Sequence, residues 1–98
     1  MSAKRKFPVE TAYINTFVQD GYGLSWTVPA GTQMRECGVD LMDVSHVLEN
    51  GHVFASDMLD QTGLWSVAGR TIENIGLNVT VNVVSSEYRV RITFVEKA

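Results

Sequence analysis

The sequence predicts a single α+β domain in which two main helices pack on one face of a three- to four-stranded antiparallel β-sheet. Helical apolar patterns occupy the first half of the chain, and the apolar period falls to about 2 residues after Gly51. Three consecutive strand patterns are then joined by short polar turns, which is typical of an antiparallel meander. The 98 residues suffice for one core, so we expect a disordered tail over residues 1–6 and one domain over residues 7–98.

The clearest local pattern predicts a helix over Asp40–Asn50. Asp40 is a good N-cap, and Asp43 places an acid in the first turn, where the helix dipole favours it. Asn50 and Gly51 predict a left-handed stop. The apolar residues between these ends recur at helical spacing and form one stripe: Leu41, Val44, Val47 and Leu48.

The chain before this helix predicts one further main helix. Pro8 suits a first helical turn, so this helix is expected over Pro8–Gln19. Its apolar stripe would consist of Val9, Ala12, Tyr13, Thr16 and Phe17. Leu24–Val28 fits a short extended piece or a loop, and Pro29–Cys37 has only a weak helical pattern that Gly31 interrupts.

The strand patterns predict a sheet with one apolar and one polar face. Strands are expected over His52–Met58, Leu64–Ile72, Leu77–Val84 and Tyr88–Val95. Because side chains alternate along a strand, one face would hold Trp65, Val67, Leu77, Val79, Val81, Val83, Val90, Ile92 and Phe94. The helices should cover that apolar face. The other face would hold Ser66, Arg70, Asn78, Thr80, Asn82, Arg89, Arg91 and Thr93.

Charge and composition exclude several classes of protein. Without the three basic residues of the tail, five Lys and Arg stand against eleven Asp and Glu, so any nucleic-acid role must rest on a local patch. No apolar run is long enough for a membrane helix, and no apolar segment follows the basic N-terminus, as a secretory signal would require. The lone Cys37 cannot form an internal disulfide. We therefore expect a cytoplasmic protein without a membrane partner.

The polar sheet face is the candidate binding site. The guanidinium group of arginine presents a fork of donors that matches phosphate oxygens, and three arginines are expected on this face. A solvent-facing sheet would show the same polar pattern without any ligand, and a small-anion site is a third interpretation. His46 and His52 have no partner at metal-ligand spacing, so we expect neither a metal nor another cofactor.

The order of these patterns resembles the small toxin domains of the RelE superfamily. The segment from Gln33 to Gly51 is similar to the RM–RG(I/V)–x3–DV–x2–VL–x–G pattern of BrnT-like members. The layout also resembles that of MqsR-type toxins, which carry similar short motifs in a helix, in a Trp-containing strand and near the C-terminus. The corresponding motifs here are Gly38-Val39-Asp40, Asp43-Val44, Val47-Leu48, Leu64-Trp65 and Phe94-Val95-Glu96-Lys97. The resemblance runs from about Pro8 onward and implies a RelE-like fold.

The resemblance also implies an activity, that of an mRNA endonuclease neutralised by an antitoxin protein. Such metal-independent cleavage needs a cation at the phosphate and groups that carry protons. Here Arg70, Arg89 and Arg91 would supply the charge, with His52 or Tyr88 as proton carriers. Substrate contacts would come from Ser66, Asn78, Thr80, Asn82 and Thr93. The alternative is a non-catalytic protein-interaction module or an inactive relative, which the acidic balance favours.

Overall fold

The computed structural model describes residues 7–20, 24–56, 63–84, 87 and 89–98. These residues form three helices and five strands, so the predicted α+β class is confirmed. The elements follow in the order α1 (Pro8–Asp20), β1 (Leu24–Trp26), α2 (Val28–Cys37), α3 (Leu41–Asn50), β2 (His52–Ser56), β3 (Leu64–Arg70), β4 (Gly76–Val84) and β5 (Arg89–Lys97).

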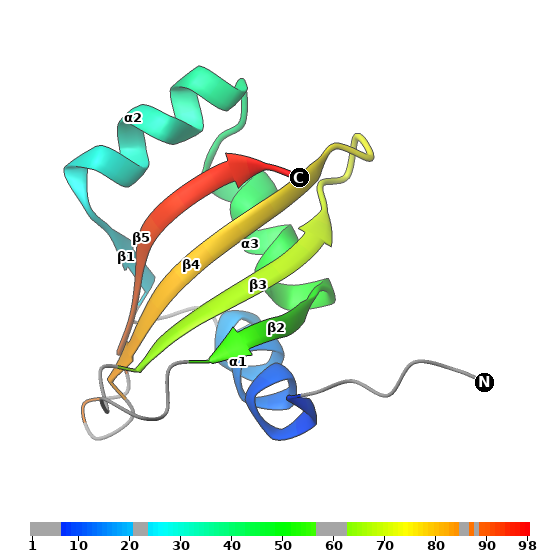
Figure 1. The fold of residues 1–98 in the computed structure, drawn as a ribbon, viewed down its shortest axis with the longest axis vertical. Coiled ribbons are helices and arrows are strands. Elements are labelled where there is room, and N and C mark those ends of the chain that lie inside the picture. Colours follow the sequence, from blue (N-terminus) through cyan, green and yellow to red (C-terminus); the bar gives the residue numbers. More distant parts are fainter. Residues whose placement is uncertain (1–6, 21–23, 57–62, 85–86, 88) are drawn as a thin grey trace.

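The sheet has the strand order β1-β5-β4-β3-β2 and is mixed (Figure 1). Strands β2 to β5 form the expected antiparallel meander, whereas β1 pairs in parallel with β5. The prediction of three to four strands, all antiparallel, was therefore wrong in count and direction. The N–H of Thr27, next to β1, donates to the carbonyl of Ile92 at 3.0 Å. The pairing of β1 with β5 joins residues more than 60 positions apart in the chain, so no local sequence pattern predicts it.

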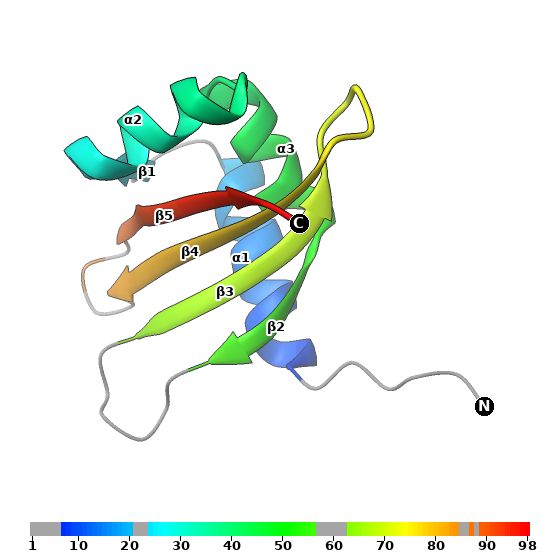
Figure 2. The ribbon, with the colours of Figure 1, turned by 45° about the horizontal axis from the view of Figure 1, so that its top comes forward.

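The third helix, α2, was only a weak pattern in the sequence. The Thr27 hydroxyl caps it by accepting from the N–H of Ala30 at 3.2 Å, and Gly38 ends it at φ 72°. Only Ala30 and Met34 are buried on this helix. The helix lies along β5 (Figure 2). It is also held there by a hydrogen bond, in which the Gln33 side-chain oxygen accepts from the N–H of Val95 at 2.8 Å.

Helix α3 begins and ends where the sequence predicts, but it stops in a different way. The Asp40 carboxylate accepts from the N–H of Asp43 at 3.0 Å, and the Asp43 carboxylate accepts from the N–H of Asp40 at 3.1 Å. The left-handed stop was wrong, because Gly51 has φ −83°. A Cβ at Gly51 would overlap the carbonyl oxygens of Val47 and Ala68. The position needs glycine for close approach rather than for a left-handed backbone.

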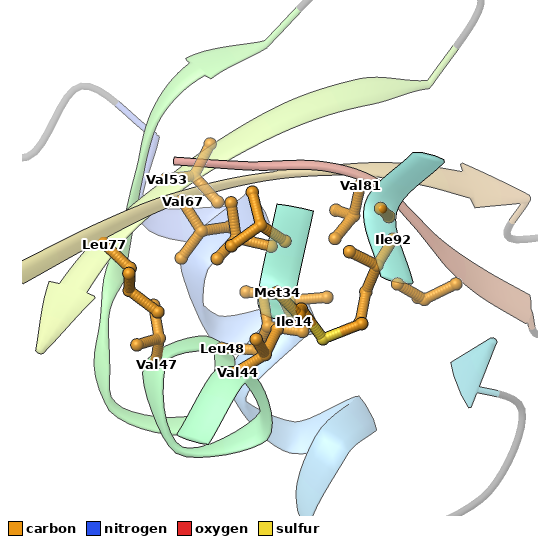
Figure 3. Packing of buried hydrophobic residues seen from close by; sticks show 14 of the residues in the cluster. Ile14, Met34, Val44, Val47, Leu48, Val53, Val67, Leu77, Val81 and Ile92 are labelled. Carbon is orange, nitrogen blue, oxygen red and sulfur yellow. The ribbon is translucent and has the colours of Figure 1, made fainter. Parts of the chain in front are cut away.

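The helices cover one face of the sheet and enclose the core between the two layers (Figures 1 and 3). The stripe of α3 meets the inward residues of β3 and β4, and Figure 3 shows Val47 facing Leu77. On α1, Ile14 and Phe17 are buried, whereas Val9 is 77% exposed although the helical pattern had included it. The Tyr13 ring packs edge-on against Trp65 with the ring centres 5.6 Å apart.

A β-bulge changes the faces of β5. Val81 pairs with Ile92 and Thr80 pairs with Phe94, so Thr93 is the extra residue of this strand. Beyond the bulge Val95 is buried and Phe94 is 41% exposed. The prediction that Phe94 belongs to the apolar face was therefore wrong, because strict alternation holds only without a bulge.

Candidate functional site

The face of the sheet opposite the helices carries the polar strand side chains and most of the positive charge of the described residues. Its outward-facing charged residues in the described part of the chain are Arg70, Arg89, Arg91 and Glu96. By contrast, the segment 8–50, within which the three helices and β1 lie, contains six acidic residues and one Arg. Charge is thus unevenly distributed, with three of the five Lys and Arg of the described residues on the open sheet face.

Strand register separates the three arginines into two groups. Arg91 pairs with Asn82 and Arg89 with Val84, at one end of β4. Arg70 pairs with Gly76 at the other end. Gly76 and Asn82 are six residues apart, which is about 20 Å along an extended strand. The predicted arginine row is therefore not one cluster.

The first group surrounds a hollow of about 450 Å³, which we call the arginine hollow. Arg89 and Arg91 flank the buried Val90, so both point to the open face with Cα atoms about 7 Å apart. Neither guanidinium has a hydrogen bond or ion pair to another described residue, which leaves its donors available. The lining residues are Leu24, Ser25, Asn82, Val84, Glu87, Arg89 and Arg91.

Asn82 lines this hollow and has a buried side-chain oxygen without a hydrogen-bond partner among the described residues. It pairs with Leu64 on one side and Arg91 on the other, in the middle of the sheet. Its Oδ1 is buried, and no other group of the described chain donates to it. An unpaired buried acceptor costs about 1–3 kcal/mol, so this side chain is not optimised for stability.

The second group lines a smaller hollow of about 300 Å³, which we call the histidine hollow because His52 and Arg70 are its ionisable side chains. The Arg70 Nη1 donates to the carbonyl of Asn74 at 3.2 Å, so part of its donor fork remains open. The His46 Nδ1 lies 3.0 Å from the Arg70 carbonyl and must be the donor there. These bonds hold the end of β3.

The other predicted contact residues lie between or beside the hollows. The hydroxyls of Ser66 and Thr80 are 3.4 Å apart, at the centre of the open face. Asn78 is half-buried on the same face. The Thr93 hydroxyl donates to the carbonyl of Thr80 at 3.2 Å, within the bulge. Tyr88 lies outside the described residues.

Sequence reasoning missed three residues of this face. Glu87 lines the arginine hollow, although it belongs to a connection and matches no strand pattern. Glu87 precedes Arg89 by two residues, and this spacing could have indicated that both side chains lie on the same face. Ser25 pairs with Arg91 only because β1 joins the sheet, and Phe94 reaches the open face only through the bulge.

The described residues contain no group of three or more His, Cys, Asp or Glu placed to hold a metal ion. Among them, no helix has the length and apolar character needed to span a membrane. Comparison with protein-family models, with curated proteins and with solved structures finds no match for this chain.

Proposed function

We propose that this protein is a toxin-like ribonuclease of the RelE-superfamily type, which binds RNA phosphates in the arginine hollow. The observation that carries the proposal is the presence of two exposed guanidiniums, Arg89 and Arg91, that line one hollow and have no partner in the described chain. Their spacing of about 7 Å allows each to bind a separate phosphate of an extended single strand.

Glu87 gives the hollow a group that can accept a proton. In the proposed reaction its carboxylate accepts the proton of a ribose 2′-hydroxyl, and the 2′-oxygen then attacks the adjacent phosphorus. The bond from phosphorus to the 5′-oxygen breaks, and this oxygen takes a proton from water. The arginine that binds the attacked phosphate stabilises the charge that develops on its oxygens, and the other arginine binds the neighbouring phosphate. Cleavage would leave a 2′,3′-cyclic phosphate and a 5′-hydroxyl.

His52 has no part in this reaction, because it lines the other hollow. This separation is the observation that favours a second candidate function, a non-catalytic module whose arginine hollow binds RNA without cleaving it, which differs from the protein-interaction module considered from the sequence. The two functions share the binding step and differ in the role of Glu87. Neutralisation by an antitoxin protein belongs to the first function only.

Purified protein incubated with single-stranded RNA tests the proposal. We expect cyclic-phosphate ends by mass spectrometry, a loss of about 10²- to 10⁴-fold in rate for Glu87→Gln, and weaker binding for Arg91→Ala. Arg35→Ala is the matched control, since it removes one exposed guanidinium from α2. RNA that is bound but never cut would select the non-catalytic module, and no binding at all would refute both functions.

A further inference from the structure

We infer that the open sheet face binds one RNA strand along a diagonal, with phosphates of the same strand held in the arginine hollow and in the histidine hollow. This inference rests on the proposed function and specifies how its ligand lies. The strand would leave Arg91 on β5, cross the middle of β4 and reach Arg70 at the end of β3. The two hollows are then two ends of one site.

The charges on the face favour the diagonal over a path along β5. Glu96 lies on β5 opposite Asn78, so a strand that followed β5 would bring its phosphates toward a carboxylate. The diagonal instead crosses the neutral side chains of Asn78, Thr80 and Ser66. The outward positions of β3 and β4 hold no carboxylate in the described chain. The path therefore has arginine side chains at both ends and crosses no carboxylate of β3 or β4 between them.

The far end of this path offers hydrogen-bond donors to a phosphate. Arg70 and His52 are both exposed and line the histidine hollow together. The bond from Arg70 to the Asn74 carbonyl fixes the direction of the side chain and leaves its remaining donors open. Between the ends, Phe94 pairs with Thr80 and presents a ring that is 41% exposed, where a base can stack.

The separation of the hollows sets the length of RNA that engages both. They are about 20 Å apart along β4 and lie on strands two spacings apart, each of about 5 Å. An extended single strand would cover this distance with about four to six nucleotides, within the site sizes of other sheet-based binders. RNA too short to reach both hollows would bind only in the arginine hollow, which has two arginines where the histidine hollow has one.

Fluorescence anisotropy with 2′-O-methyl oligouridylates tests this inference, because the methyl group blocks cleavage while the phosphates remain. We expect the affinity to rise steeply at about four to six nucleotides. Arg70→Ala should weaken the binding of the longer oligomers about tenfold and leave that of the dinucleotide unchanged. It should also reduce the salt dependence of log K for the longer oligomers by about 0.7, the value for one phosphate contact on a single strand.

Arg70→Lys and Arg35→Ala are the controls. The lysine variant keeps the charge and should retain the salt dependence, and the Arg35 variant should bind every length as the wild type does. Equal effects of Arg70→Ala on short and long oligomers, or no effect on either, would overturn the diagonal and leave the proposed function intact. Absence of binding at every length would instead refute the proposed function.

Discussion

Replacing Asn82 with leucine should stabilise the protein and weaken the proposed binding of RNA. Leucine has nearly the shape of asparagine, so it fills the same space without the buried oxygen that lacks a donor. Removing that unpaired acceptor should raise the free energy of unfolding by about 1–3 kcal/mol. For a domain of this size, 1 kcal/mol corresponds to about 4–8 °C in Tm, so an increase of about 4–24 °C is expected.

Asn78→Leu provides the matched control for this prediction. Asn78 lies on the same face of the same strand and is also half-buried, but neither of its amide atoms is buried without a partner. Any gain from the higher strand propensity of leucine applies to both variants. The difference between the two in urea denaturation therefore measures the cost of the Asn82 oxygen alone.

The same variants should separate in RNA binding. Asn82 lines the arginine hollow and Asn78 does not, so only Asn82→Leu should lose a polar contact beside the bound phosphate. A loss of about ten- to hundredfold in affinity is expected for a hydrogen bond to a charged group. If Asn82→Leu is no more stable than Asn78→Leu, the oxygen is satisfied in solution and the reasoning is refuted.

Three further substitutions test other parts of the structure. Gly51→Ala should lower the free energy of unfolding by about 3 kcal/mol or more in urea denaturation, because its Cβ would overlap the Ala68 carbonyl; a mild effect would mean that β2 and β3 can move apart. Asp40→Ala should remove the capping box of α3 and cost about 1 kcal/mol in the same assay, and an unchanged midpoint would contradict that role. Phe94→Ala should leave Tm within a few degrees of wild type and reduce single-stranded RNA affinity by about 1–3 kcal/mol, measured by anisotropy; equal affinity would exclude stacking on this ring.

Elements that rest on contacts between near neighbours in the chain were predictable. Helix α3 is an example, because the Asp40 cap and the stripe of Val44, Val47 and Leu48 all lie within one short segment. The same holds for β4, where each alternate valine is buried as the pattern indicates. The polar identity of the open face followed from this alternation, and so did the outward direction of Arg89 and Arg91.

The arrangement of the site could not be predicted in the same way. The bulge at Thr93 depends on how β5 pairs with β4, and it decides that Phe94 faces outward and Val95 inward. Glu87 joined the hollow from a connection whose path no periodicity describes. The site that was expected to contain three arginines and His52 is therefore two hollows, each built from residues that different strands bring together.

The sequence by itself determined the α+β class, the ends of α3, the meander and the polar face, because i, i+4 and i, i+2 spacing reflect local backbone geometry. Only the tertiary structure decided that β1 joins β5, that Gly51 lies against β3, and that Arg70 is about 20 Å from Arg91 along β4. These features depend on strand register and close packing. Both are set by contacts between residues far apart in the chain, which no local pattern encodes.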